Sequence, residues 1–409
     1  MILSPRLRAT AAPPIPAARA WAARYAGAAG PALDLTQAVP GYPPPPEMLR
    51  RLGEAAGSAA FAGYGPIAGE YLLREALAAD ISARYGAAIA PAEVAITAGC
   101  NLAFAMVMAA LAAEGEAVLL PTPYYFNHHM TLTLQGARPI PLPTRAEDGF
   151  VPDPAWVEAL LIEHRAKAVV LVSPNNPTGA VYPPAVIEAV AALCRAHGAA
   201  LVLDETYRDF LPAVGSPEAE GERCESAGPF NAPPPHGLFQ DPNWRDVLVH
   251  LYSFSKAYCV PGHRVGAVVA GSAFQVELAK ALDTWQICPA RPAQSVLAWA
   301  VPALAAWREG NRALMAERAT FFRQQIGQLP GWRLDAIGTF FAYLRLPEDA
   351  PEAVRAAEIL AAEQGLMTLP GPFFGPGQER HLRLAFANAG SEVLAQVPAR
   401  LAALSRTWR

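Results

Sequence analysis

The sequence predicts an α/β protein with a mostly parallel sheet sandwiched between helices, and a smaller α+β domain beside it. Short, continuously apolar runs alternate with helical stretches between about residues 47 and 300, as expected of strands covered on both faces. After about Pro302, a long helical stretch leads into an α+β pattern. We therefore expect a large domain over 48–305, and a small one formed by 306–409 with the N-terminal arm 1–47.

The arm is rich in proline and alanine, and so many fixed φ angles disfavour a long helix or a central strand. We expect one short helix there, over 17–26. In the large domain the apolar runs predict strands over 94–97, 117–120, 168–172, 200–203, 247–252 and 265–270. Helical stretches between them are expected over 67–85, 101–113, 156–164 and 185–197. In the small domain, a helix extending to Gln328 precedes strands near 340–346 and 381–386.

Residues 211–243 interrupt this alternation, because they are rich in proline, glycine and glutamate. The composition predicts a long loop. Loops of this length in a compact enzyme tend to be functional or disordered.

Composition excludes several classes of protein. A net charge of −4 and a pI near 6.1 give no basic surface for nucleic acid or for an anionic membrane. The longest apolar run, 102–113, is too short to span a bilayer, and segment 1–19 lacks the apolar core of a signal peptide. Five cysteines without CxxC spacing argue against a disulfide framework or a zinc site. We expect a cytoplasmic enzyme without a metal.

The end of the predicted strand over 247–252 carries the first chemical feature, Lys256. Burial at the end of an apolar sheet lowers the pKa of a lysine and makes its amine a nucleophile toward an aldehyde. Lysine is rare in this arginine-rich chain, which favours a role that a guanidinium cannot fill. The alternative is a lysine in a surface loop.

Two groups of residues near this lysine suit a phosphate. Ser253, Ser255 and Arg264 together offer two hydroxyls and one guanidinium. Gly99, Cys100 and Asn101 form a strand-to-helix turn, whose free N–H groups and helix dipole favour an anion. Alone, this second group could equally be an ordinary β–α turn.

These segments resemble the class I and II aminotransferases, which are pyridoxal phosphate (PLP) enzymes of fold type I. Ser253-Phe-Ser-Lys256, followed by Arg264, resembles the family's Schiff-base lysine and phosphate arginine. Segment 173–179 is similar to its Asn-Pro-Thr-Gly motif, 204–207 to its aspartate and tyrosine pair, and 381–386 to its carboxylate-binding arginine. The motifs occur in the family's order, and the resemblance covers most of the chain.

The resemblance implies how the cofactor is held. Asp204 pairs with the pyridine nitrogen, while Asn176 and Tyr207 hydrogen-bond the phenolic oxygen. Tyr125 stacks on the ring, with Tyr124 as the competing assignment. Taken alone, Asp204 could instead cap a helix, and Asn176 with the following proline could form a turn.

The resemblance also implies the reaction. Arg383 binds the substrate α-carboxylate in a bidentate fork, beside Asn176 and Ala38. Lys256, released from its Schiff base, moves a proton between the substrate and the cofactor. The amino group of an L-amino acid passes to a 2-oxo acid in a ping-pong sequence. Tyr64 resembles the tyrosine that reaches the neighbouring subunit's phosphate, so a homodimer is expected.

Some positions are expected to contact the site residues rather than the cofactor, and others depart from the family pattern. His128 is expected either to support Asp204 or to be a core histidine. Ala38 stands where the family usually has glycine, and His263 where it often has tryptophan. No residue is identified for a substrate's distal carboxylate, although three arginines are candidates against a surface role: Arg19, Arg24 and Arg291.

Two other functions compete with transamination. A PLP-dependent lyase acting by β-elimination would use the same residues, since motif spacing does not show which bond at Cα is broken. A non-catalytic binding protein on the same fold is the third alternative. The intact set of Lys256, Asp204 and Arg383 argues against it, and the arm before residue 47 is too short for an added DNA-binding domain.

Overall fold

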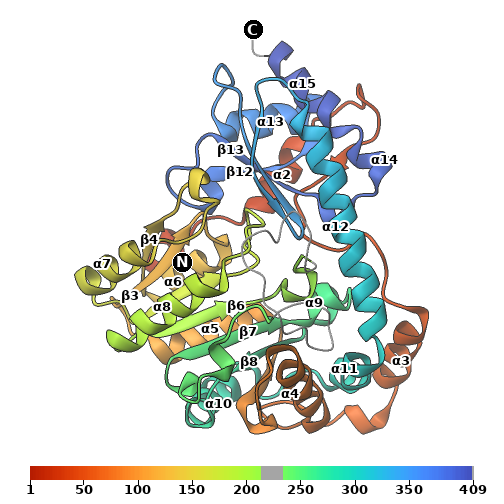
Figure 1. Cartoon of the computed structure of the whole chain (residues 1–409). Coiled ribbons are helices and arrows are strands. Elements are labelled where there is room, and N and C mark those ends of the chain that lie inside the picture. The colour runs from red at the N-terminus through yellow and green to blue at the C-terminus, as the bar shows by residue number, and fades with distance from the viewer. Residues whose placement is uncertain (213–233, 408–409) are drawn as a thin grey trace.

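The computed structural model describes residues 1–212 and 234–407, arranged as a lower and an upper lobe (Figure 1). The lower lobe contains a seven-stranded sheet in the order β2-β8-β7-β6-β5-β3-β4. Strand β8 runs opposite to the other six strands. The strands of this sheet are β2 (Val94–Thr97), β3 (Ala117–Thr122), β4 (Arg138–Pro143), β5 (Ala168–Val172), β6 (Ala200–Asp204), β7 (Leu248–Ser253) and β8 (Gly266–Val269). The predicted α/β class and mostly parallel sheet are confirmed.

Helices cover both faces of this sheet because its central strands carry apolar side chains on both sides. One face packs against α5 (Cys100–Leu111), α6 (Phe126–Gln135) and α10 (Ser272–Gln286). The other packs against α3 (Pro46–Ala56), α4 (Tyr71–Tyr85), α7 (Pro154–His164), α8 (Pro184–Ala196) and α11 (Arg291–Ala303). Successive residues of β3 alternate between the two cores, with Leu119 in one and Leu120 in the other.

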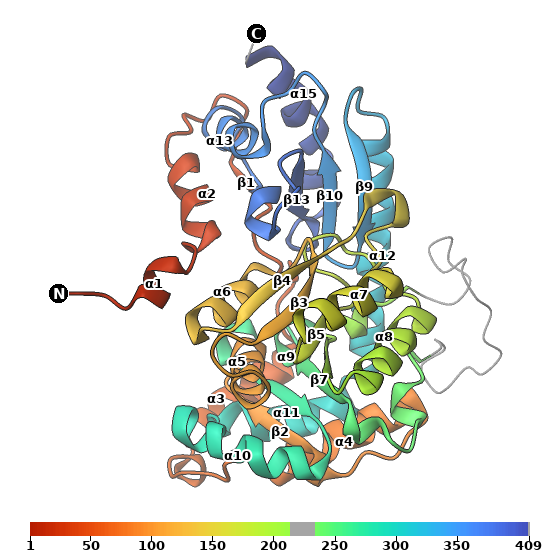
Figure 2. The ribbon, with the colours of Figure 1, turned by 90° about the vertical axis from the view of Figure 1, so that its left-hand side faces the viewer.

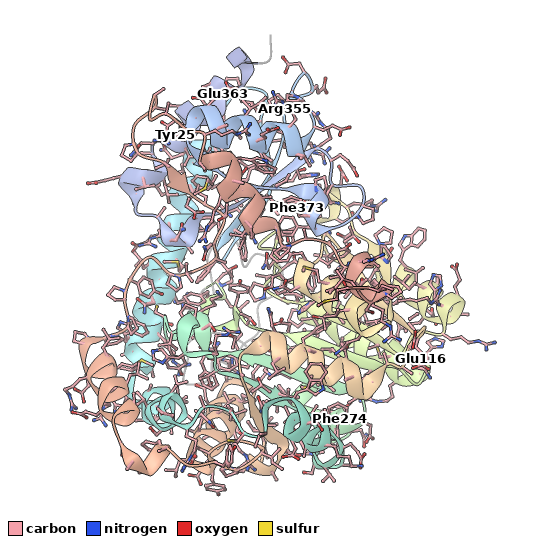
Figure 3. The ribbon with its side chains drawn as sticks, turned by 180° about the vertical axis from the view of Figure 1, so that it is seen from behind. Tyr25, Glu116, Phe274, Arg355, Glu363 and Phe373 are labelled. Carbon is pink, nitrogen blue, oxygen red and sulfur yellow. The ribbon has the colours of Figure 1, made fainter. Side chains whose placement is uncertain are left out.

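The upper lobe contains a four-stranded antiparallel sheet in the order β12-β13-β10-β9. These strands are β9 (Arg333–Gly338), β10 (Phe341–Arg345), β12 (Leu369–Pro370) and β13 (His381–Ala385). The helices of this lobe are α12 (Ala305–Gly327), α13 (Ala353–Gln364), α14 (Ser391–Leu394) and α15 (Val397–Thr407). Seen from behind, Arg355 and Glu363 lie in this lobe, whereas Glu116 and Phe274 lie in the lower one (Figure 3).

The N-terminal arm joins the two lobes. Strand β1 (Leu33–Asp34) pairs with β11 (Leu366–Met367), and α2 (Pro14–Ala22) packs against α13. The preceding α1 (Pro5–Ala9) instead contacts α6 of the lower lobe, where Arg6 Nη1 donates to the carbonyl of Gln135 at 3.3 Å. Figure 2 shows α2 beside the upper lobe and α1 beside α6.

Several predicted elements need correction. The arm has two helices rather than one over 17–26, and the helix expected over 67–85 begins at Tyr71, after a turn. Strand β4 was not predicted because three of its six residues are proline, which a strand accepts at a sheet edge, where β4 lies. Helix α6 and strand β9 were also missed.

The remaining predictions concern the insertion and the domain division. Residues 213–233 of the predicted 211–243 loop lie outside the described residues. The described end of that segment contains a 3-10 helix, Leu238–Gln240, so it is not loop throughout. The division into 48–305 and 1–47 with 306–409 stays a prediction.

No helix within 1–212 and 234–407 is long and apolar enough to cross a membrane. The same residues contain no cluster of His, Cys, Asp and Glu side chains arranged to hold a metal ion.

Candidate active site

The parallel strands of the lower sheet end at one edge, and a cavity of about 260 Å³ lies there, lined also by Arg383 of the upper lobe and by residues of the N-terminal arm. In such sheets, ligands bind outside the carboxyl ends of the strands. All but two of the predicted site residues line it: Ala38, Cys100, Asn101, Tyr125, Asn176, Asp204, Tyr207, Ser253, Ser255, Lys256, Arg264 and Arg383. The exceptions are Gly99 and Tyr64.

Lys256 follows β7 in the short helix α9 (Phe254–Ala257) and lines the cavity. Burial, together with the positive charges of Arg264 and Arg383, lowers the pKa of its amine to about 8. An appreciable fraction is therefore unprotonated near neutral pH and can attack a carbonyl carbon.

Asp204 ends β6 and is buried. Burial alone raises the pKa of a carboxyl group, but hydrogen bonds from His128 and Thr206 hold the pKa of Asp204 below its ordinary value. His128 Nε2 lies 3.3 Å from Oδ2, while the Thr206 amide and hydroxyl donate to Oδ1 at 3.0 and 2.7 Å. The carboxylate stays ionised and faces the cavity, and of the two roles expected for His128, the contact with Asp204 is present.

The end of the cavity beside α9 combines hydroxyls, a guanidinium and a helix N-terminus. Ser253 Oγ accepts from the amide of Ser255 at 3.3 Å and caps α9. Arg264 has a left-handed backbone with φ +53°, and its Nη1 donates to the carbonyl of Pro261 at 3.1 Å. Its guanidinium passes so close to Gly99 (φ +86°) that a Cβ there would overlap it. Glycine at position 99 thus allows the arginine to approach the first turn of α5.

Arg383 of β13 enters the cavity from above, and its guanidinium lies 5.1 Å from the ring centres of both Phe341 and Phe374. Its Nη1 donates to Asn176 Oδ1 at 3.0 Å and its Nη2 to the carbonyl of Thr36. Burial lowers the pKa of Arg383 to about 10, and its buried Nε has no hydrogen-bond partner among the described residues. A buried, unpaired guanidinium nitrogen suits a carboxylate ligand.

The two tyrosines considered for the ring-stacking position lie in different places. Tyr125 lines the cavity and accepts from Asn127 Nδ2 at 2.8 Å. Tyr124 instead stacks on His129, with ring centres 5.2 Å apart, and does not line the cavity. This placement favours Tyr125 as the ring-stacking residue.

Other predicted residues lie away from the cavity. Tyr64 is 83% exposed and His263 is exposed as well. Arg24 pairs with Glu358 at 2.7 Å, and Arg291 Nε pairs with a Glu70 oxygen at 2.5 Å. Neither of these two arginines lines the cavity of this chain, and the exposed Arg19 does not line it either.

Sequence reasoning missed some residues that shape the site. Thr206 was detectable, because a threonine two residues after an aspartate commonly bonds back to its carboxylate. Phe341 and Phe374 had no local pattern to identify them, since their contact with Arg383 depends on tertiary packing. Ile15 lines the cavity from α2, and nothing in the proline-rich and alanine-rich sequence around it predicted that position.

The residues present fit PLP. An amine of lowered pKa, an ionised buried carboxylate, and a phosphate-sized group of donors line one cavity. The orphaned Nε of Arg383 adds a donor for a substrate carboxylate. Each functional group of the cofactor therefore has a partner of suitable charge.

Comparison with known proteins gives a consistent result. Residues 31–401 match the family model for class I and II aminotransferases. An aspartate/prephenate aminotransferase of Thermus thermophilus is 30% identical over 84% of either chain, and an aromatic aminotransferase of Arabidopsis thaliana is 26% identical over 90% of this chain and 88% of its own. The solved structure of Thermus thermophilus aspartate aminotransferase with maleate superposes with a TM-score of 0.85 at 28% identity, covering 99% of this chain and 100% of that one.

Proposed function

The chain belongs to the class I and II aminotransferases, and we propose that its cavity moves the amino group of an L-amino acid to a 2-oxo acid in two successive half-reactions. PLP, the cofactor of this family, supplies an electron sink that stabilises negative charge at the substrate Cα. The observation that carries the proposal is the buried amine of Lys256, whose pKa is lowered to about 8, in one cavity with the ionised carboxylate of Asp204.

We assign the phosphate to the end of the cavity beside α9. Arg264 and the hydroxyls of Ser253 and Ser255 supply charge and donors there, and the first turn of α5 supplies unpaired N–H groups. These N–H groups belong to Cys100 and Asn101, whereas the amide of the preceding Gly99 donates to the carbonyl of Thr97 at 2.7 Å. The close approach of the Arg264 guanidinium to Gly99 supports this assignment of the phosphate.

We assign the ring to the middle of the cavity. Asp204 holds a proton on the pyridine nitrogen, because its carboxylate is ionised and turned toward the cavity. Asn176 and Tyr207 donate to the phenolic oxygen, and Tyr125 packs on the ring face. Burial raises the pKa of Tyr207 well above its ordinary value, so its hydroxyl keeps the proton that it donates.

Arg383 and Lys256 act on the substrate itself. The guanidinium binds the α-carboxylate, and its contacts with the rings of Phe341 and Phe374 restrict its orientation. This contact also fixes the direction of the Cα–H bond. With PLP bound, Lys256 Nζ would take the proton from the substrate Cα and move it within the same cavity, a transfer that its pKa near 8 makes possible at neutral pH.

We further propose a cytoplasmic homodimer. Tyr64 is 83% exposed on a single chain, and its neighbour Gly65 donates to Cys288 Sγ at 3.3 Å. A large aromatic side chain held out from an anchored loop suits insertion into a second subunit, where its hydroxyl would reach the phosphate.

A panel of amino acids tests the proposed function. Purified holoenzyme is mixed with each amino acid without an acceptor, and 2-oxo acid is measured. We expect one equivalent of the matching 2-oxo acid per site, and continuous turnover only after a second 2-oxo acid is added. Release of ammonia and pyruvate would instead identify a lyase, and no product from any amino acid would identify a binding protein.

A further inference from the structure

We propose that Ile15, Val39 and Phe126 form an apolar subsite that selects amino acids with uncharged, apolar side chains. The inference rests on the proposed function, since it identifies the substrate class of the same cavity. All three residues line that cavity, and each comes from a different segment: α2, the loop after β1, and the start of α6.

The subsite is adjacent to the arginine that binds the α-carboxylate. Phe374 lies 5.1 Å from the Arg383 guanidinium, and its ring centre is 5.9 Å from that of Phe126. Ile15 and Phe126 both pack against the buried cluster that contains Phe374. An apolar wall therefore runs from Arg383 to Ile15. A side chain leaving Cα, one bond from the carboxylate, meets this wall.

The charges of the residues that line the cavity also favour an apolar substrate side chain. Among the described residues, the cations that line the cavity are Lys256, Arg264 and Arg383, and each already has an assigned role. The polar side chains that line the cavity from the arm, Thr36 and Gln37, are neutral. A distal carboxylate would lose its hydration without gaining a cation from the chain that supplies this wall, whereas a hydrocarbon side chain gains burial.

The arm holds Ile15 in place from both lobes. Helix α2 packs against α13 above, and α1 contacts α6 below through the Arg6 and Gln135 hydrogen bond. Phe126 is the first residue of that same α6. The arm therefore links α2, which carries Ile15, to α6, which carries Phe126 (Figure 2).

Binding of two unreactive acids to the holoenzyme tests the inference without turnover. The acid 4-methylpentanoate corresponds to leucine without its amino group, and succinate to aspartate without its own. We expect calorimetric titration to give a Kd at least about tenfold lower for 4-methylpentanoate. Ile15→Ala should raise that Kd by about tenfold and leave the Kd of succinate nearly unchanged. Ile15→Lys should reverse the preference, because it adds a cation at the wall.

Leu7→Ala is the matched control, because it shortens an aliphatic side chain of the same arm that is half exposed and does not line the cavity. It should leave both Kd values unchanged. Tighter binding of succinate by the wild-type protein, or equal effects of Ile15→Ala and Leu7→Ala, would overturn the inference. These constants decide it whether or not the amino acid panel turns over. An inactive panel with the expected Kd values would overturn the proposed function alone.

Discussion

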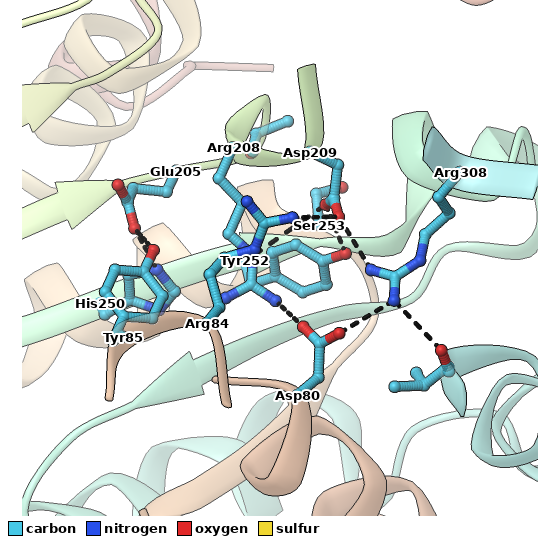
Figure 4. A network of polar contacts seen from close by, with 12 residues as sticks. Asp80, Arg84, Tyr85, Glu205, Arg208, Asp209, His250, Tyr252, Ser253 and Arg308 are labelled. Atoms are coloured by element: carbon cyan, nitrogen blue, oxygen red, sulfur yellow. Dashed lines mark hydrogen bonds and ion pairs between the residues drawn. The ribbon is translucent and has the colours of Figure 1, made fainter. Parts of the chain in front are cut away.

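Two neighbouring sets of charged residues differ in how their cations are paired. In the polar network of Figure 4, three arginines, Arg84, Arg208 and Arg308, lie against the carboxylates of Asp80 and Asp209. Arg208 Nη2 donates to Asp80 at 2.5 Å, and Arg308 donates to Asp80 and Asp209 at 2.9 and 2.8 Å. In the cavity, Lys256 shares its surroundings with the cations Arg264 and Arg383, without a carboxylate paired to any of the three within the described residues.

The difference shows which set is available to a ligand. Every arginine of the network already contacts an aspartate carboxylate of the same network, so none of the three is left for a ligand. The cavity leaves positive charge uncompensated, and an anionic cofactor and substrate complete it. The two sets diverge within a few residues of one chain segment: Asp204 and Tyr207 line the cavity, while Arg208 and Asp209 turn into the interior.

The largest expected effect comes from removing the amine of the cavity. Lys256→Ala should lower turnover by at least about a thousandfold, because one group both attacks the carbonyl and moves the proton. It should not lower the free energy of unfolding of the apo protein, since it removes a desolvated amine. Steady-state kinetics and urea denaturation measure the two. Lys280→Ala is the control, because Lys280 is an exposed lysine paired with Glu277. Retention of a tenth of the turnover would refute the role.

A substitution in the polar network should lower the stability of the protein and leave its turnover nearly unchanged. Asp80→Ala leaves two buried arginines without one of their carboxylate partners, and we expect the free energy of unfolding to fall by about 3 kcal/mol. Turnover per folded molecule should stay within about twofold, since Asp80 does not line the cavity. Glu54→Ala, at an exposed ion pair with Arg50, should leave the urea midpoint unchanged. Equal loss of activity and stability in the Asp80 variant would mean that the two sets are coupled.

The comparison also explains what could be predicted from the sequence. The parallel strands were recognisable because burial on both faces demands uninterrupted apolar runs, as in 168–172 and 200–203. Lys256, with Ser253 and Ser255, was recognisable at the end of a predicted strand. Asn176, Asp204, Tyr207 and Arg383 were recognisable through their resemblance to aminotransferase motifs. The network was not predicted, since charged residues such as Asp80 on α4 and Arg308 on α12 show no local sign that they meet.

The same limit applies to parts of the site. Ile15 lies on a short helix of a proline-rich arm, and its position over the cavity depends on contacts with α13 and α6. Phe374 precedes Arg383 in sequence but packs on its guanidinium only after β12 and β13 pair. Long-range packing of this kind has no periodicity that a single sequence reveals.

A smaller effect is expected at Asp204, the carboxylate that lines the cavity among the described residues. His128→Phe removes a hydrogen bond to Asp204, so the pKa of that carboxyl should rise. We expect kcat to fall by about tenfold at neutral pH and the acidic limb of the pH–rate profile to move upward. His129→Phe, one residue away and stacked on Tyr124, should change neither. An unshifted profile with lowered kcat would point to a packing role for His128 instead.

The smallest effect tests whether the uncompensated cations act on one another. The pKa of Lys256 is about 8 in the folded protein, against 10.5 ordinarily, so the amine is mostly protonated below pH 8 and free above it. Cofactor loading of the apo protein should therefore accelerate about tenfold per pH unit below 8 and level off above it. Arg264→Gln removes a neighbouring positive charge that disfavours the protonated amine, so the midpoint should move upward by a fraction of one unit.

Because Arg264 also serves the phosphate, the loading rate will fall at every pH, and only the midpoint reports on the lysine. Arg145→Gln, an exposed arginine paired with Asp148, should leave the midpoint in place. A midpoint that does not move in Arg264→Gln would mean that burial alone sets the reactivity of Lys256.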